Sequence, residues 1–234
     1  EENNIELLYS RIIEVCKKIN LSYELIFVND GSFDNSLELI KHISDTDKNV
    51  KFIDFSRNFG HQIAITAGMD KATGKYIVFI DADLQDPPEL IEKLYLKTQE
   101  GFDVVYTIRK SRKGESVFKK ATAKAYYRIL RSITKCNIPV DAGDFRIISA
   151  KVANILKKMP EQQKFIRGQI AWVGFKQAFI EYDREPRKGG KSGYPISKMT
   201  RFAVDGITSF SDFPLKFATY LGFFVSIIAF VLMM

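Results

Sequence analysis

The sequence predicts an α/β fold with a mainly parallel sheet, and three observations support this prediction. Short apolar segments typical of strands alternate with segments whose apolar residues recur at helical spacing. Carboxylate and amide residues follow two of the apolar segments, as is usual where ligands bind at the carboxyl ends of parallel strands. The length of 234 residues is enough for one large domain with a substantial core. We therefore expect one α/β domain with an appendage.

Each element is predicted from its own pattern. Helices are expected where apolar residues recur every three or four positions, and strands where β-branched or aromatic residues run together. Gly60 leads into the third helix, and Pro87 opens the fourth at its first turn, where proline is tolerated. In chain order the predicted elements are a helix at 5–19, a strand at 23–28, a helix around 37–43, a strand at 51–55, a helix at 60–74, a strand at 75–80, a helix from 87 and a strand at 102–108.

The regular alternation fades after Arg109. A basic stretch at 109–120 leads into a helix around Tyr126, and the sequence Asp-Ala-Gly-Asp-Phe-Arg follows at 141–146. Gly143 allows a tight turn there that would aim Asp144. Beyond Pro195, apolar residues share one helical face, which suits a juxtamembrane amphipathic helix on a bilayer; packing against the soluble domain fits the periodicity equally well.

The C-terminus predicts a membrane anchor. The residues 217–234 carry no charge, and at about 1.5 Å per residue they nearly span a hydrocarbon core of about 30 Å. We expect the start of a transmembrane helix; a buried core helix is the alternative. No secretory signal opens the chain and basic residues precede the span, so the catalytic part is expected on the cytoplasmic side of the inner or plasma membrane.

Charge and cysteine content restrict the partners. Lys and Arg number 35 against 28 Asp and Glu, a net charge of +7 that suits nucleic acid, a phosphorylated substrate or a membrane surface. Nucleic acid is the least favoured, because no recognition motif accompanies the basic residues. Cys16 and Cys136 lie far apart and indicate neither a zinc site nor a disulfide framework.

Asp81 and Asp83 follow the most apolar predicted strand, one residue apart. At the rim of a sheet, two carboxylates are hard oxygen ligands that hold Mg²⁺ or Mn²⁺ and leave positions for substrate phosphates. As a bare pattern Asp-x-Asp is weak, because most instances are solvated acidic turns. In this context it predicts a divalent-metal site for a nucleotide-bound substrate.

Four motifs then indicate a family. Together, and in this order before a membrane span, they resemble the polyprenyl-phosphate glycosyltransferases, which include dolichol-phosphate mannose synthase and the bactoprenol-phosphate glucosyltransferases. The resemblance implies a Rossmann-like GT-A domain, a cytosolic nucleotide-sugar donor with UDP-glucose favoured over GDP-mannose, and inverting transfer to a membrane polyprenyl phosphate. The motifs lie at 28–32, 56–60, 81–88 and 141–146, and the implied domains are a catalytic domain at 1–183, a basic loop with an interfacial helix at 184–213 and a truncated transmembrane helix at 214–234.

The same resemblance assigns donor-site residues. Asp30 would hold the base or ribose, although an Asx turn made by Asp30 is an alternative. Asp81 would lie near the ribose and the metal, Asp83 would ligate the metal at the diphosphate, and Gln85 would complete the site. Asp86 is expected to cap the following helix rather than to bind a ligand.

Acceptor residues are assigned in the same way. Arg109 and Arg112 are the first choices for a clamp on the anionic lipid headgroup; an exposed basic loop that merely faces anionic lipid is the alternative. A phosphate nucleophile is already ionised, so a strong general base is unnecessary, and Asp144 is expected to orient the acceptor or the sugar.

Arg187, Lys191 and Ser192 resemble the family's basic loop, which closes over donor and acceptor. A Walker A loop is rejected, because it needs glycine where Glu185 stands. His61 is expected to be a structural helix cap, and Trp172 a buried core aromatic, with a place in the acceptor pocket as the alternative.

Two departures and two rival functions remain. The family's first strand and its base-holding turn are reduced to Glu1–Glu2, and the chain stops inside its first membrane helix, where the family carries at least one more. We therefore expect a piece of a longer protein, and a homo-oligomer stays open. A processive polysaccharide synthase would carry tryptophan where Gly168 follows Arg167. A membrane-tethered nucleotide-binding scaffold would need no metal.

Overall fold

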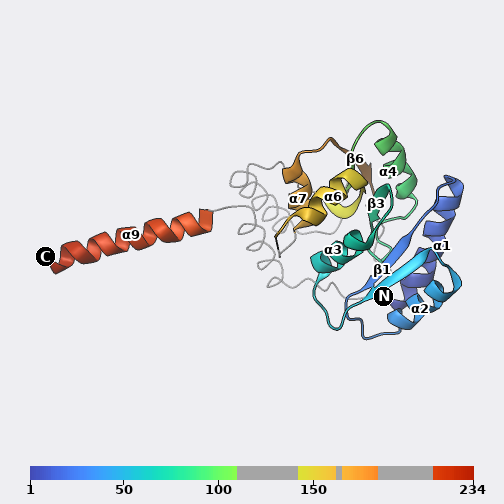
Figure 1. Ribbon diagram of the computed structural model, residues 1–234, viewed down its shortest axis with the longest axis horizontal. Helices are drawn as coiled ribbons and strands as arrows, with labels where there is room; N and C mark the ends of the chain where they lie inside the picture. Colours follow the sequence, from blue (N-terminus) through green and yellow to red (C-terminus); the bar gives the residue numbers. More distant parts are fainter. Residues whose placement is uncertain (110–141, 162–164, 184–212) are drawn as a thin grey trace. The chain divides into compact units, whose positions relative to one another are not determined.

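The computed structural model describes residues 1–109, 142–161, 165–183 and 213–234 (Figure 1). The chain divides into two compact units, and the described part of the second is 213–234. The predicted helix around Tyr126 and the interfacial helix after Pro195 lie outside the described residues. Each unit is therefore considered by itself.

All eight elements predicted for the first 109 residues are confirmed, with small shifts at their ends. The local pattern was sufficient here because each helix packs against a core and each strand is a short segment rich in β-branched or aromatic residues. The elements are α1 (Glu2–Lys18), β1 (Leu25–Asn29), α2 (Ser36–Thr46), β2 (Val50–Asp54), α3 (His61–Lys71), β3 (Tyr76–Phe79), α4 (Leu90–Gln99) and β4 (Val104–Arg109).

Four further elements lie in the described part of the first unit, and the periodicity did not predict them. They are β5 (Ala142–Ser149), α6 (Ala150–Lys158), α7 (Ile166–Val173) and β6 (Gln177–Tyr182). Ser149 ends β5 and caps α6, because its hydroxyl accepts a hydrogen bond from the amide of Val152 at 3.4 Å. Gly174 ends α7 in the left-handed conformation, with φ of 72°.

The strands pair in a mixed pattern, which corrects the prediction of a mainly parallel sheet. β1 pairs with β2 in parallel, and a four-stranded sheet has the order β3-β5-β4-β6. In that sheet β4 and β6 are parallel, but β5 runs antiparallel to both of its neighbours. Of the four pairings among the described residues, two are therefore antiparallel. The cause is β5, which lies between β3 and β4 and was predicted as a turn around Gly143.

Helices cover two opposite faces of the strands (Figure 1). One core cluster joins α1, α2 and α4 to residues such as Val105 and Ile147. The other joins α3, α6 and α7 to Val104 and Ile148. Neighbouring residues of one strand thus enter different cores, as the twofold period of a β-strand requires. This arrangement fixes the register of β5 and thereby the place of the residues at its start.

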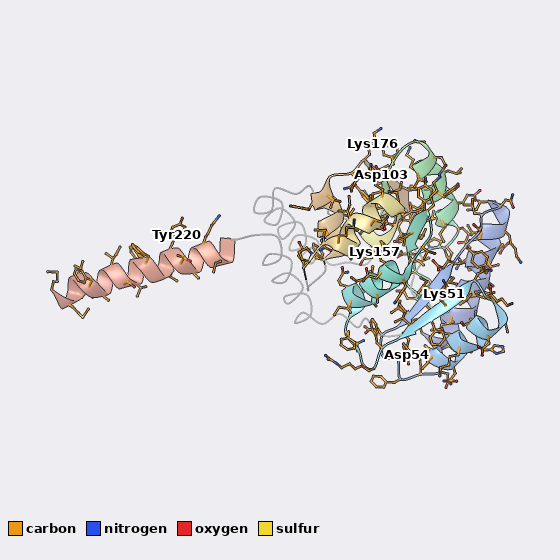
Figure 2. All side chains as sticks on the ribbon, viewed as in Figure 1. Lys51, Asp54, Asp103, Lys157, Lys176 and Tyr220 are labelled. Carbon is orange, nitrogen blue, oxygen red and sulfur yellow. The ribbon has the colours of Figure 1, made fainter. Side chains whose placement is uncertain are left out.

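Polar contacts attach the C-terminal elements to the N-terminal half. The ammonium group of Lys157 on α6 donates to the carbonyl of Ala72 at 2.8 Å, just after α3 (Figure 2). The Ser149 hydroxyl donates to the carboxylate of Asp103 at 3.1 Å, immediately before β4 (Figure 2). These bonds and the shared core hold α6 against the sheet.

The described part of the second unit is one helix, α9 (Phe213–Met233). Its segment Leu215–Met233 is 19 residues long with a mean hydropathy of 2.0, which is long and apolar enough to cross a membrane. The hydroxyl groups of Thr219 and Ser226 donate to carbonyls one turn earlier, at Leu215 and Gly222. These two hydroxyl groups are therefore satisfied within the helix, as an apolar environment requires.

Candidate active site

Two strand ends bring Asp81 and Asp144 together. Phe79, the last residue of β3, pairs with Arg146 of antiparallel β5. Asp81 lies two residues after Phe79 and Asp144 two residues before Arg146, so the same register places the two aspartates opposite each other. A parallel β5 would have carried Asp144 to the other end of the sheet.

The carboxylate of Asp144 is held by three cationic or imidazole groups. His61 Nε2 lies 3.1 Å from Asp144 Oδ2, and Arg167 Nη2 from α7 lies 3.1 Å from Asp144 Oδ1. Arg146 Nη2 lies 3.6 Å from the same Oδ1 and donates to the carbonyl of Gly143 at 2.7 Å. Burial alone would raise the pKa of Asp144, but Arg167, His61 and Arg146 outweigh it and hold the pKa well below its usual range. Asp144 is therefore a fixed anion.

His61 lies between the two aspartates. It is the first residue of α3, and its Nδ1 is 3.8 Å from Asp81 Oδ1 while its Nε2 faces Asp144. Desolvation lowers the pKa of His61, but the two carboxylates overcome this and raise it above the ordinary value. The expectation that His61 caps the helix is wrong: the cap residue is Gly60, and the imidazole belongs to the site.

Asp81 has an unusual protonation equilibrium. Desolvation at the strand ends, together with the negative charges of Asp144, Asp83 and Asp86, raises the pKa of Asp81 to about 6, although His61 opposes the rise. A concentration of carboxylates that resists full ionisation is a common property of functional sites. The raised pKa of Asp81 also means that positive charge added beside this carboxylate would be stabilised.

Asp83 shapes the turn that follows. Its Oδ1 accepts a hydrogen bond from the backbone amide of Gln85 at 3.1 Å, and the buried Leu84 between them has a left-handed φ of 54°. This turn fixes the direction of the Asp83 carboxylate. Asp86 is not the expected helix cap, since α4 begins at Leu90. Its side chain is only 1% exposed and accepts a hydrogen bond from the hydroxyl of Tyr182 on β6.

Asp30 joins two loops beside the site. Its carboxylate accepts hydrogen bonds from the backbone amides of Phe59 at 2.6 Å and Gly60 at 2.9 Å. The expected Asx turn at Asp30 is not formed, because the amide of Ser32 donates to Asn29 Oδ1 instead. In this structure Asp30 positions the loop that leads into α3, and its contact with a nucleotide stays a prediction.

The remaining predicted residues are placed as follows. Arg109 is the last residue of β4, and only its backbone is described. Trp172, expected in the core, is 62% exposed on α7. Arg112, Arg187, Lys191 and Ser192 lie outside the described residues.

Sequence reasoning missed His61 and Arg167 as site residues. Arg167 carried a signal, because it is the one charged residue of α7 and needs an anionic partner when buried. For His61 the sequence held no comparable signal. Its partners Asp81 and Asp144 lie 20 and 83 residues away in the sequence. These two acids meet through the pairing of β3 with β5.

The predicted metal site has suitable chemistry. Within residues 1–109, 142–161, 165–183 and 213–234, no group of three or more His, Cys, Asp or Glu side chains is arranged to hold an ion by itself. Two carboxylates with substrate phosphates and water can still complete the shell of Mg²⁺ or Mn²⁺. The raised pKa of Asp81 agrees with this, since a cation would favour its ionised form.

A solved structure shares this architecture. A mannosyltransferase from Pyrobaculum calidifontis, determined with GDP-mannose and Mn²⁺, superposes with a TM-score of 0.53 at 17% identity, over 77% of this chain and 52% of that chain. Such a likeness shows the fold. The fold of the first unit is thus of the GT-A type.

Sequence comparison gives the family. The model of glycosyl transferase family 2 matches residues 1–156, and the chain belongs to this family. An uncharacterized glycosyltransferase, YkcC of Bacillus subtilis, is 53% identical over 97% of this chain and 70% of its own length. A prophage bactoprenol glucosyl transferase homolog of Escherichia coli is 38% identical over 99% of this chain and 76% of its own length. The predicted resemblance to the bactoprenol enzymes is confirmed.

Proposed function

We propose that this protein transfers a sugar from a nucleotide-sugar donor to a membrane polyprenyl phosphate, with inversion at the anomeric carbon. A phosphate oxygen of the lipid forms a bond to the anomeric carbon, and the bond from that carbon to the nucleotide diphosphate breaks. Relatives named bactoprenol glucosyl transferase support the lipid acceptor and favour glucose, hence UDP-glucose as donor.

The observation that carries the proposal is the meeting of Asp81 and Asp144 at the ends of β3 and β5, beside the Asp83 turn. The donor diphosphate would lie at Asp83 and Asp81, which the sequence also suggests. The cluster supplies carboxylates for a metal, and Arg167 and Arg146 hold the charge of Asp144 beside them. Such preorganised charges suit transfer between two phosphate-bearing substrates. It favours an enzyme over a tethered scaffold.

Mg²⁺ or Mn²⁺ would be held by Asp83 and Asp81, with Gln85 beside them. When bound, such an ion stabilises the charge that develops on the departing diphosphate. The chain's own residues prepare this place: the Gln85 amide orients the Asp83 carboxylate, and His61 lies against Asp81 on the side of Asp144.

Asp144 acts in this proposal as a fixed negative charge and not as a proton acceptor. Arg167 and His61 hold its pKa well below the usual range, so it is a weak base at neutral pH. The lipid phosphate is already ionised and needs no base. Asp144 therefore orients the sugar or the groups around it.

The membrane supplies the acceptor. α9 fits a membrane span by length and composition, and a hydrophobic anchor would keep the catalytic unit at the surface where the polyprenyl phosphate lies. We place the catalytic unit on the cytoplasmic side, where nucleotide sugars are made. Arg109 and Arg112 are proposed to bind the lipid phosphate, with Arg187, Lys191 and Ser192 in the loop that closes over it.

The test is a transfer assay in membranes. Full-length protein is incubated with polyprenyl phosphate, Mg²⁺ and a panel of labelled sugar nucleotides that includes UDP-glucose and GDP-mannose, and label entering the organic phase is measured. UDP-glucose should give the strongest signal, and chelation of divalent cations should remove it. Asp83→Asn should abolish transfer while the far-UV circular dichroism stays unchanged. Full activity of that variant, or transfer that survives chelation, would refute the assignment.

A further inference from the structure

His61 has no assigned role in the proposed transfer, although it contacts two acids of the site. Its imidazole faces Asp144 through Nε2 and Asp81 through Nδ1, and so connects the acid on β5 with the acid beyond β3. We propose that His61 is a positioning residue that, opposite Arg167, fixes the orientation of the Asp144 carboxylate for sugar transfer. This inference rests on the proposed function.

The two oxygens of Asp144 are bound from opposite elements. His61 on α3 engages Oδ2 and Arg167 on α7 engages Oδ1, both at 3.1 Å. A carboxylate held through both oxygens loses its freedom to rotate about χ2, whereas one contact would leave it free to turn. The pair therefore determines the direction in which Asp144 presents its charge.

The spacing of the two holding residues is itself fixed. The side-chain carbonyl of Gln62 accepts a hydrogen bond from the backbone amide of Ile166 at 3.2 Å. Gln62 follows His61 and Ile166 precedes Arg167 in the sequence, so this bond joins the starts of α3 and α7 directly beside the two residues. Ile166 is also buried in the core shared by these helices. The distance between His61 and Arg167 is thus set by contacts between the two helices as well as by the two side chains themselves.

His61 also separates two acids. Asp81 and Asp144 face each other at paired strand ends, and their negative charges repel each other. The imidazole lies against both acids and reduces this repulsion. Without the imidazole, the Asp144 carboxylate would be expected to rotate toward Arg146, whose Nη2 is already 3.6 Å away.

A purely structural role for His61 is disfavoured by its surroundings. Its side chain is 40% exposed, so shortening it leaves no buried cavity. The core contacts of α3 are made by Met69 and Ile65, further along the helix. Loss of the imidazole should therefore change catalysis much more than stability.

The experiment compares His61→Ala and His61→Gln in full-length protein, with His42→Ala as the matched control, since His42 is the other histidine of the chain and is exposed on α2. His61→Ala should lower kcat for sugar transfer on the order of 10- to 100-fold, as small misplacements of site groups do. The KM for the nucleotide sugar should change less than about threefold, because only positioning in the reacting complex is lost. The glutamine variant keeps an amide N–H for Asp144 and should recover most of kcat, and His42→Ala should match the wild type.

A crystal structure of His61→Ala gives a readout that does not depend on the sugar or the lipid. Rotation of the Asp144 carboxylate away from its present contact with Arg167 supports the proposal. An unmoved carboxylate, a kcat within about threefold of the wild type, or a parallel fall of kcat and thermal stability would overturn it. Absence of lipid-linked sugar with the wild-type enzyme would instead count against the proposed function, and the Asp144 orientation would still decide this inference.

Discussion

Gly31→Ala should destabilise the first unit far more than a comparable substitution elsewhere, because two loop backbones meet at Gly31. A methyl group at this position would lie 2.6 Å from the amide nitrogen of Asn58 and 2.7 Å from the carbonyl carbon of Arg57. Both are backbone atoms and cannot rotate away. The loops must therefore separate, although Asp30 binds them together through the amides of Phe59 and Gly60.

The expected size follows from two contributions. Gly31 has φ of 68°, and a left-handed conformation costs an alanine about 1 to 2 kcal/mol. Losing one of the two hydrogen bonds to the Asp30 carboxylate costs about 1.5 to 3 kcal/mol more. The free energy of unfolding should thus fall by about 2.5 to 5 kcal/mol, and Tm on the order of 10 °C.

Gly101→Ala is the matched control. Gly101 also has a left-handed φ, of 90°, but a methyl group there meets nothing within 4 Å. It should show the conformational cost alone, about 1 to 2 kcal/mol. The assay is urea unfolding in detergent, followed by far-UV circular dichroism. Equal losses for the two variants would refute the reasoning that contact between the loops makes Gly31 necessary.

Three further outcomes are expected. Tyr182→Phe removes the hydroxyl that donates to buried Asp86 and should cost about 2 to 3 kcal/mol in the same unfolding assay, and an unchanged midpoint would contradict this. Burial and the hydrogen bond to Asp47 raise the pKa of Tyr9 to about 12, so this tyrosine contributes stability that is complete below pH 10 and is lost as the pH rises through 12. The stability difference between wild type and Tyr9→Phe should shrink over that range in urea titrations, and a constant difference would exclude the effect. Removal of residues 213–234 should reduce transfer to long polyprenyl phosphates far more than binding of the nucleotide sugar, measured by calorimetry, and equal losses would argue against an anchoring role.

The N-terminal part of the fold could be predicted because its helices and strands each show a clear period. The elements after residue 141 could not, because β5 contains Gly143 and Asp144 within its first residues and reads as a turn. Strand direction is also absent from a local pattern. An apolar run such as Ile147–Ile148 is compatible with either direction, and only the pairing with β3 and β4 decides it.

The sequence predicted only part of the candidate site, because strand direction also decides which of its residues meet. Asp81 and Asp144 were identified from motifs, but their position opposite each other depends on the antiparallel register. His61 was predicted as a cap because a polar residue at a helix start usually has that role, whereas here Gly60 takes the cap position. Trp172 was predicted inside because large aromatics usually are, yet α7 turns its Ile166 and Ile170 inward and leaves Trp172 in solvent.

The central place of β5 also has a consequence for how such enzymes can diversify. Because this strand is bonded on both sides, to β3 and to β4, its position does not depend on the chain that leads into it. Insertions, deletions or replacement of sequence between residues 110 and 141 should therefore leave the acid at the start of this strand in place.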